Sequence, residues 1–142
     1  MPTKRLTNQY RTTLNAFATL LFVCGATLSP IATQAAEMPS TKVCTDKDNP
    51  PKDNVTVGGC LAQDQRKGNC LSCHLIPGGT LPGNVGPPLI GMQQRFPDKA
   101  KLRAQIWDAT VTNPNTVMPP FGRNKILSDN EIDKIVEFLY TL

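Results

Sequence analysis

The sequence has a single histidine, His74, one tryptophan and few aromatic residues of any kind. One histidine excludes every site that needs two, such as a two-histidine zinc centre or a multihaem cytochrome with two histidines on each iron. The most apolar run, residues 16–26, has 11 residues, whereas crossing a bilayer takes roughly 20. Because 39% of the residues are hydrophobic and no repeat is present, collagen, coiled-coil and polytopic membrane proteins are excluded as classes.

The first 36 residues have the three-part pattern of a secretory signal peptide. Three basic residues fall within the first eleven, no acidic residue precedes Glu37, and the apolar run is followed by small residues that end at Ala35 and Ala36. The short run disfavours the alternative, a retained membrane anchor. Cys24 follows Val23, where a lipoprotein signal would carry a small residue, so lipidation is not expected. We expect cleavage after Ala35 or Ala36 and export to the periplasm.

Removing residues 1–36 changes the charge of the chain. The whole sequence carries 15 basic and 11 acidic residues, a net charge of +4, and three of the basic ones lie in residues 1–36. The remaining 106 residues therefore carry 12 basic and 11 acidic side chains, a net charge of +1. Since they contain no basic run, a nucleic acid is not an expected partner. With the signal cleaved, no membrane contact is expected either.

Proline, glycine and apolar periodicity divide the remaining chain. Residues 37–56 are polar and broken by prolines, which predicts an extended N-terminal arm before a domain at residues 57–142. A first short helix is expected at about 59–67. The stretches 75–97 and 113–127 hold most of the glycine and proline and are expected to be long loops. No β-hairpin pattern is present, so we predict an all-α fold of three to four short helices.

Two further helices have clear start signals. Asp98 can cap a helix that runs to about Thr110, with apolar residues at helical spacing. Ser128 and Glu131 form a capping box at the start of the last helix. The apolar stripes that would face the core are Leu102, Ile106 and Ala109 in the first of these helices and Ile132, Ile135, Val136 and Leu139 in the second.

Residues 70–74 read Cys-Leu-Ser-Cys-His, the pattern of c-type haem attachment. Cysteines three apart lie on one side of a helical turn, so both thiols can reach the vinyl groups of one porphyrin while His74 projects at the iron. A thioredoxin-like dithiol is expected within a βαβ unit, and the sequence has no such pattern. A four-cysteine zinc site from Cys44, Cys60, Cys70 and Cys73 would leave His74 without a role.

The two loops offer a hydrogen-bond acceptor for His74 and a sixth ligand for the iron. The stretch 86–89, Gly-Pro-Pro-Leu, can offer a backbone carbonyl to the second nitrogen of His74, although it can also be a plain turn. With no second histidine, a methionine is the expected sixth ligand. Met118 is favoured because Pro119 and Pro120 stiffen its segment, while Met92 has the apolar context of a packing residue. Met38 lies too near the start of the mature chain.

The cysteine count leaves one pair over. With Cys24 in the signal and two cysteines on the haem, Cys44 and Cys60 remain, and an oxidising compartment favours a disulfide between them. Two unpaired thiols or a redox pair are the alternatives.

Over roughly residues 55–142 the chain resembles the class I cytochromes c and, among them, the SoxX family of small haem subunits. The Cys-x-x-Cys-His motif alone does not distinguish cytochrome families, but an ordered set of segments does. These segments are residues 68–74, 83–89, 91–92, 95–98, 106–110, 113–114, 118–122, 126–128 and 138–142.

The resemblance implies a class I cytochrome c fold wrapped around one covalently bound haem c. Cys70 and Cys73 would attach it, His74 and Met118 would bind the iron, and the carbonyl of Pro87 would accept a hydrogen bond from His74. Trp107, Phe96 and Phe121 are expected to wall the haem pocket. The charged residues Lys99, Lys101, Arg123 and Lys125 are expected to form a solvated face.

The resemblance also implies a role in a heterodimer with a larger SoxA-like haem subunit. In that family the complex joins the sulfane sulfur of thiosulfate to a cysteine of a SoxYZ-type carrier protein, an L-cysteine S-thiosulfotransferase reaction. The small subunit holds no catalytic residue, and it passes electrons to a soluble acceptor cytochrome. A free-standing periplasmic electron carrier is the alternative. A disulfide- or zinc-stapled binding module without haem is a third hypothesis.

Overall fold

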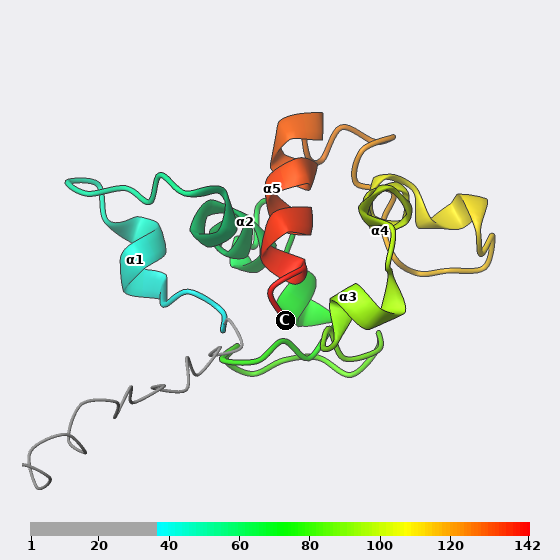
Figure 1. Ribbon diagram of the computed structural model, residues 1–142, viewed down its shortest axis with the longest axis horizontal. Coiled ribbons are helices and arrows are strands. Elements are labelled where there is room, and N and C mark those ends of the chain that lie inside the picture. The colour runs from blue at the N-terminus through cyan, green and yellow to red at the C-terminus, as the bar shows by residue number, and fades with distance from the viewer. Residues whose placement is uncertain (1–36) are drawn as a thin grey trace, which may run out of the picture. The chain divides into compact units, whose positions relative to one another are not determined.

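Figure 1 shows the computed structural model, which describes residues 37–142, all within one compact unit. The signal peptide and its cleavage sites fall outside the described residues. Within 37–142 there is no strand, which confirms the all-α prediction. The helices are more numerous than expected, five α-helices and two single 3₁₀ turns. They are α1 (Thr41–Thr45), α2 (Asn54–Gln63), α3 (Met92–Arg95), α4 (Lys99–Trp107), α5 (Asp129–Leu139), η1 (Cys70–Ser72) and η2 (Ala109–Val111).

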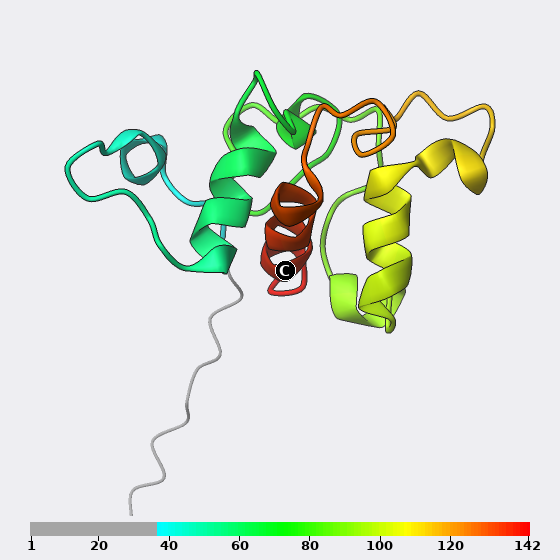
Figure 2. The same ribbon diagram turned by 90° about the horizontal axis from the view of Figure 1, so that it is seen from above.

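Helices α2 and α5 lie side by side and form the centre of the fold, as Figure 1 and Figure 2 both show. Their backbones touch at Gly58, where an added Cβ would collide with the carbonyl group of Lys134. Gly59 is equally confined, because Pro39 and Phe138 fill the space beside it. Helix α4 packs on the other side of α5 (Figure 2), so α5 is covered on two sides.

Helix α5 begins and packs as the sequence predicts. The Ser128 hydroxyl accepts a hydrogen bond from the Glu131 amide at 3.3 Å, and the Glu131 carboxylate accepts one from the Ser128 amide at 2.8 Å. This reciprocal capping box satisfies two amides that have no partner within the helix. The whole predicted stripe is buried: Ile132, Ile135, Val136 and Leu139.

Helix α4 begins as predicted, since the Asp98 carboxylate accepts a hydrogen bond from the Ala100 amide at 2.8 Å. It ends at Trp107, not at Thr110 as expected. Asp108 has an extended backbone and uses its carboxylate to cap the separate turn η2, accepting from the Thr110 amide at 3.0 Å. A capping aspartate therefore replaces the last helical turn.

The prediction for the first helix was wrong at both ends. Helix α2 spans residues 54–63, whereas 59–67 was expected. It begins early because the Asp53 carboxylate caps it, accepting from the Thr56 amide at 2.8 Å. It ends at Gln63, because the extended backbone of Asp64 stops the helix. The domain boundary expected at residue 57 thus falls inside this helix.

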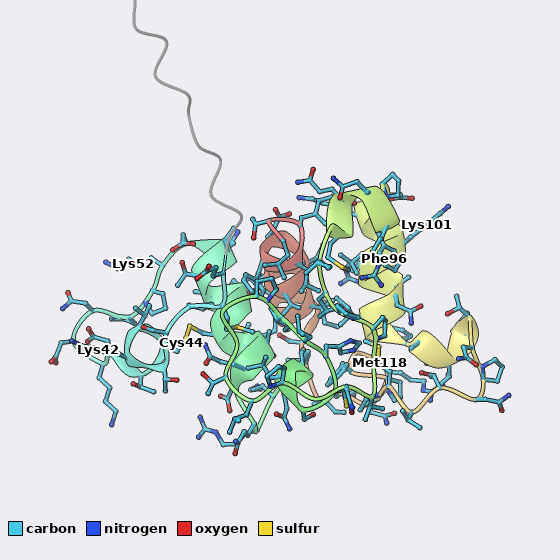
Figure 3. All side chains as sticks on the ribbon, turned by 90° about the horizontal axis from the view of Figure 1, so that it is seen from below. Lys42, Cys44, Lys52, Phe96, Lys101 and Met118 are labelled. Carbon is cyan, nitrogen blue, oxygen red and sulfur yellow. A yellow bond between two sulfur atoms is a disulfide. The ribbon has the colours of Figure 1, made fainter. Side chains whose placement is uncertain are left out.

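The arm at residues 37–56 is not simply extended, since it contains α1 and packs on the domain. Met38 is buried, and its amide donates a hydrogen bond to the carbonyl of Pro77 at 2.8 Å. A disulfide joins Cys44 of α1 to Cys60 of α2, with a Cα–Cα distance of 5.3 Å, and Figure 3 shows Cys44 beside α2. The stretch expected as one loop at 75–97 is likewise interrupted by α3.

Candidate haem-binding site

A cavity of about 560 Å³ opens between the turn η1, the two long loops and the helices α4 and α5. This volume lies within the range of roughly 300–1,000 Å³ that small-molecule and cofactor sites occupy. The predicted attachment residues Cys70, Cys73 and His74 line it together. Its apolar walls come from residues on α4, α5 and the loops, including Phe96, Leu102, Ile106, Phe121, Ile135 and Leu139.

The turn η1 presents these three side chains together. The amide of Cys73 donates to the carbonyl of Cys70 at 3.2 Å, and the amide of His74 donates to the same carbonyl at 2.9 Å. Asn69 enters the turn with a left-handed backbone, φ 46°. Cys70 and Cys73 are both free thiols, so neither is used in a disulfide.

The thiols of this turn do not fit the rival sites. Burial raises the pKa of the Cys70 thiol to about 12, so it is neutral at physiological pH. A thioredoxin-like nucleophile requires the opposite, a lowered thiol pKa. Cys44 and Cys60 are joined to each other, and across residues 37–142 no three His, Cys, Asp or Glu side chains form a group that could hold a metal ion. The proposed four-cysteine zinc cluster is therefore not assembled.

His74 is fixed by the loop that follows it. Its Nδ1 lies 2.7 Å from the carbonyl oxygen of Pro87. Because a carbonyl only accepts, this contact requires the proton on Nδ1 and leaves the lone pair of Nε2 free to bind a metal. The loop is held against the turn by the Gly86 amide, which donates to the Cys73 carbonyl at 2.8 Å. A Cβ at Gly86 would collide with the imidazole, so only glycine leaves room for the ring.

Of the three methionines in residues 37–142, two line the cavity and one does not. Met118 lines it from the segment 113–127, which we call the strap, and Figure 3 shows its position after α4. Met92 also lines the cavity but is only 1% exposed, and its sulfur accepts a hydrogen bond from Arg95 Nη1 at 3.5 Å. Met38 is buried elsewhere in the core and does not line it.

The strap is fastened to the end of α4 through Trp107. The carbonyl of Trp107 accepts hydrogen bonds from the amides of Gly122 at 3.0 Å and Arg123 at 3.3 Å. The indole lies so close to Gly122 that a Cβ there would collide with it. Trp107 therefore packs against the strap and, contrary to expectation, does not line the cavity. Phe96 and Phe121 do line it, as expected.

An ion pair between the buried Asp108 and the half-exposed Arg123 holds the same junction. Asp108 is 4% exposed and accepts from Arg123 Nη1 at 2.7 Å and from the Thr110 hydroxyl at 2.6 Å. Hydrogen bonds from Thr110 lower the pKa of Asp108 against the opposing effect of burial, and the positive charge of Arg123 lowers it further. Arg123 was expected on a solvated face. No local pattern indicates its contact with a residue fifteen positions earlier.

The sequence analysis also missed Arg95. It lines the cavity, and its guanidinium donates to the carbonyl of Pro88 at 2.5 Å. Lys67 lines the cavity as well, but its ammonium is paired with Glu131 at 3.0 Å. The guanidinium of Arg95 therefore lies beside the cavity, and it is suited to bind carboxylates such as haem propionates.

These residues fit a haem c. The cavity has apolar walls for a porphyrin, two free thiols on one turn for its vinyl groups, and an imidazole whose Nε2 is kept available. Gly86 provides the clearance that the imidazole needs.

Two comparisons with known proteins bear on this site. Residues 62–139 match the family described as "Cytochrome C oxidase, cbb3-type, subunit III". A protein named "Uncharacterized lipoprotein" from Aquifex aeolicus (strain VF5) is 33% identical over 76 residues, which cover 53% of this chain and 37% of that protein. The chain thus spans little more than a third of that relative's length. No helix in the described part of the chain has the length and apolar character needed to cross a membrane.

The matched segment includes the turn at residues 70–74 and the helices α3, α4 and α5 that surround the cavity. It also covers more than half of the chain. The chain therefore belongs to this family of cytochrome c domains, which implies a covalently bound haem and a role in electron transfer.

Proposed function

We propose that the chain is the electron-transfer subunit of a periplasmic complex that oxidises thiosulfate, and that it holds a single haem c. The observation that carries an electron-transfer role is the chemistry of the cavity. Among residues 37–142 no Asp or Glu side chain lines it, and its histidine is held by Pro87. With no general base and no activated nucleophile, the site suits the storage of an electron better than the conversion of a substrate.

Each residue has a defined part in this proposal. Cys70 and Cys73 hold the group covalently, His74 binds the iron through Nε2, and Met118 binds it from the other side. The carbonyl of Pro87 keeps the proton on Nδ1 and fixes the orientation of the ring. A haem with histidine and methionine ligands supplies a one-electron centre of raised potential.

The one-electron capacity motivates the partners. Joining the sulfane sulfur of thiosulfate to a carrier cysteine releases two electrons, so a second redox centre must take part. We propose that a larger SoxA-like haem subunit carries out this chemistry on a SoxYZ-type carrier, and that a soluble cytochrome accepts the electrons. The ordered motifs between residues 68 and 142 support this assignment.

The first experiment tests the complex. We expect the chain to co-purify with a larger haem subunit, and deletion of this chain to abolish thiosulfate-dependent reduction of the acceptor cytochrome. A monomer that is reduced and reoxidised without thiosulfate would favour a free-standing electron carrier. If the purified chain lost its red colour on denaturation, the haem would not be covalently bound.

The second experiment tests the ligand assignment. We expect Met118→Ala to abolish the weak sulfur-to-iron absorption band at the red end of the spectrum, while Met92→Ala keeps it. Because Met92 is fully buried, its replacement should instead lower the free energy of unfolding by about 2–5 kcal/mol. The reverse pattern of bands would assign Met92 as the ligand.

A further inference from the structure

Asp108 is the one buried residue with a polar or charged side chain among residues 37–142. It has no part in the electron-transfer role proposed above, since it does not line the cavity. Burying a carboxylate costs free energy unless hydrogen bonds and an opposite charge compensate for it. The contacts that compensate for this burial show what the residue does in the fold.

The two carboxylate oxygens of Asp108 bind residues at opposite ends of the strap. Oδ1 accepts hydrogen bonds from the amide and the hydroxyl of Thr110, which precedes the strap, at 3.0 Å and 2.6 Å. Oδ2 accepts from Arg123 Nη1, near the other end, at 2.7 Å. The same Nη1 donates to the Thr110 hydroxyl at 3.1 Å. We call Asp108, Thr110 and Arg123 the clasp, because they close residues 110–123 into a loop.

Met118 lies within this loop, in a part of the strap that has no separate hydrogen-bonded anchor. Over the described part of the chain, every hydrogen bond of residues 114–119 stays within residues 113–118. Three prolines in residues 114–120 restrict the backbone on both sides of the methionine. A stiff segment that is anchored by hydrogen bonds only at its base takes its position from that base.

The clasp acts on the cavity from outside. None of its three residues lines the cavity, whereas the strap does so through Met118 and its neighbours. A substitution in the clasp can therefore affect a group in the cavity only by moving the strap.

We propose that Asp108 and Arg123 are positioning residues for Met118. Their ion pair holds the methionine sulfur over the cavity and keeps the sixth position of the iron closed to external ligands. The proposal rests on the proposed ligand role of Met118. A loop that is open at its base has more conformations, so the sulfur would spend a smaller fraction of time in its bound position. An external ligand would then bind more tightly, because its apparent affinity follows the fraction of open sites.

The test compares Arg123→Met with Arg103→Met in the haem-loaded full chain. Arg103 is the matched control because it also pairs with carboxylates, but these are Asp129 and Asp133 of α5. We expect Arg123→Met to weaken the sulfur-to-iron band, to lower the reduction potential and to bind added imidazole at least about tenfold more tightly than the original protein. Arg103→Met should leave the band, the potential and the imidazole affinity unchanged.

A further control separates positioning from a general loss of stability. Cys44→Ser removes the disulfide between α1 and α2 and should lower the free energy of unfolding, but it leaves the clasp intact. Its band and its imidazole affinity should therefore equal those of the original protein.

Two more variants test whether the ion pair acts as a unit. Asp108→Asn should have the same effect as Arg123→Met, and the double variant should bind imidazole no more tightly than either single variant. Arg123→Lys keeps the positive charge, so its imidazole affinity should lie between those of the original protein and Arg123→Met. It also supplies the measurement if circular dichroism shows that Arg123→Met does not fold.

A full band and an unchanged imidazole affinity in folded Arg123→Met or Asp108→Asn would overturn the proposal, as would an equal change in Arg103→Met or Cys44→Ser. If the band survived Met118→Ala, the ligand assignment would be wrong and the clasp would have no ligand to position. If Met118→Ala alone lost the band, the assignment would stand and only the role of the clasp would fail. These measurements use neither thiosulfate nor a partner, so the proposed complex could fail while the role of the clasp holds.

Discussion

The indole ring of Trp107 fills the space that a side chain at residue 122 would need. This contact, together with the hydrogen bonds from the strap to the Trp107 carbonyl, fixes the end of the strap that carries Met118. A single methyl group at residue 122 should therefore disturb the strap.

We expect Gly122→Ala to lower the free energy of unfolding by roughly 1–3 kcal/mol, because the indole or the strap must move to admit the Cβ. Urea unfolding measures the loss. In the double variant with Trp107→Ala the collision is gone, so its loss should be smaller than the sum of the single losses. Strict additivity would show that the two residues do not interact.

The ion pair between Arg123 and Asp108 should matter more than the surface pairs. Arg123→Met leaves the carboxylate of Asp108 buried with only Thr110 as a partner, and we expect a loss of about 1–3 kcal/mol. This is below the value for a fully buried pair because Arg123 is itself half exposed. The matched control is Arg66→Met, which breaks a pair between Asp64 and an almost fully exposed arginine and should lower the stability much less. Equal losses in the two variants would contradict this ranking.

Acidification should remove part of the same stabilisation. The pKa of Asp108 is lowered in the folded protein from 3.8, first by hydrogen bonds from Thr110. A carboxyl with a lowered folded pKa stabilises the fold above its unfolded pKa, and this contribution is lost as the pH falls through the folded value. We expect the free energy of unfolding to drop below about pH 4 and Asp108→Asn to make that drop shallower. An unchanged acid limb in Asp108→Asn would argue against this residue as a contributor.

Gly86→Ala should affect the candidate haem site directly. The added Cβ would displace the ring of His74 and weaken its contact with the Pro87 carbonyl. Disturbing the hydrogen-bond partner of a metal-binding histidine lowers metal affinity by about tenfold or more. We therefore expect the haem content per polypeptide to fall at least about tenfold. Pro87→Ala is the control, since the accepting carbonyl belongs to the backbone and survives the substitution. Equal haem content in both variants would oppose this account of Gly86.

The disulfide between Cys44 and Cys60 closes a short loop, with a sequence separation of 16. On the chain-entropy estimate, Cys44→Ser should lower the free energy of unfolding by about 3 kcal/mol. A reducing agent should bring the original protein to the same stability as the variant. A variant as stable as the oxidised protein would show that the bond constrains nothing of consequence.

Local signals predicted the helices that carry them. The capping box of α5 and the aspartate before α4 are complete within a few residues, and both helices begin where the sequence indicates. The same holds for the turn at residues 70–74, where spacing alone brings the thiols and the imidazole together.

The errors arose where distant residues decide the structure. Residues 37–56 were expected to form an extended arm, yet they contain the helix α1, and burial of Met38 and the disulfide at Cys44 hold them on the domain. The resemblance to the class I cytochromes c implied that Trp107 would wall the haem pocket. Its position is instead set by Gly122, whose lack of a side chain has no meaning until the strap is folded onto α4.

The close crossing of α2 and α5 at Gly58 ties the beginning of the domain to its end. The turn at residues 70–74, Pro87 and Met118 all lie in the stretch of chain between these two helices, and α5 itself adds Ile135 and Leu139 to the cavity wall. Opening that crossing would release both loops at once, so the site has no independent way to unfold. In hydrogen-exchange terms, the amides of α2 and α5 should exchange with the free energy of global unfolding. Loss of the site should then be a cooperative event shared by the whole domain, not a local fluctuation of its loops.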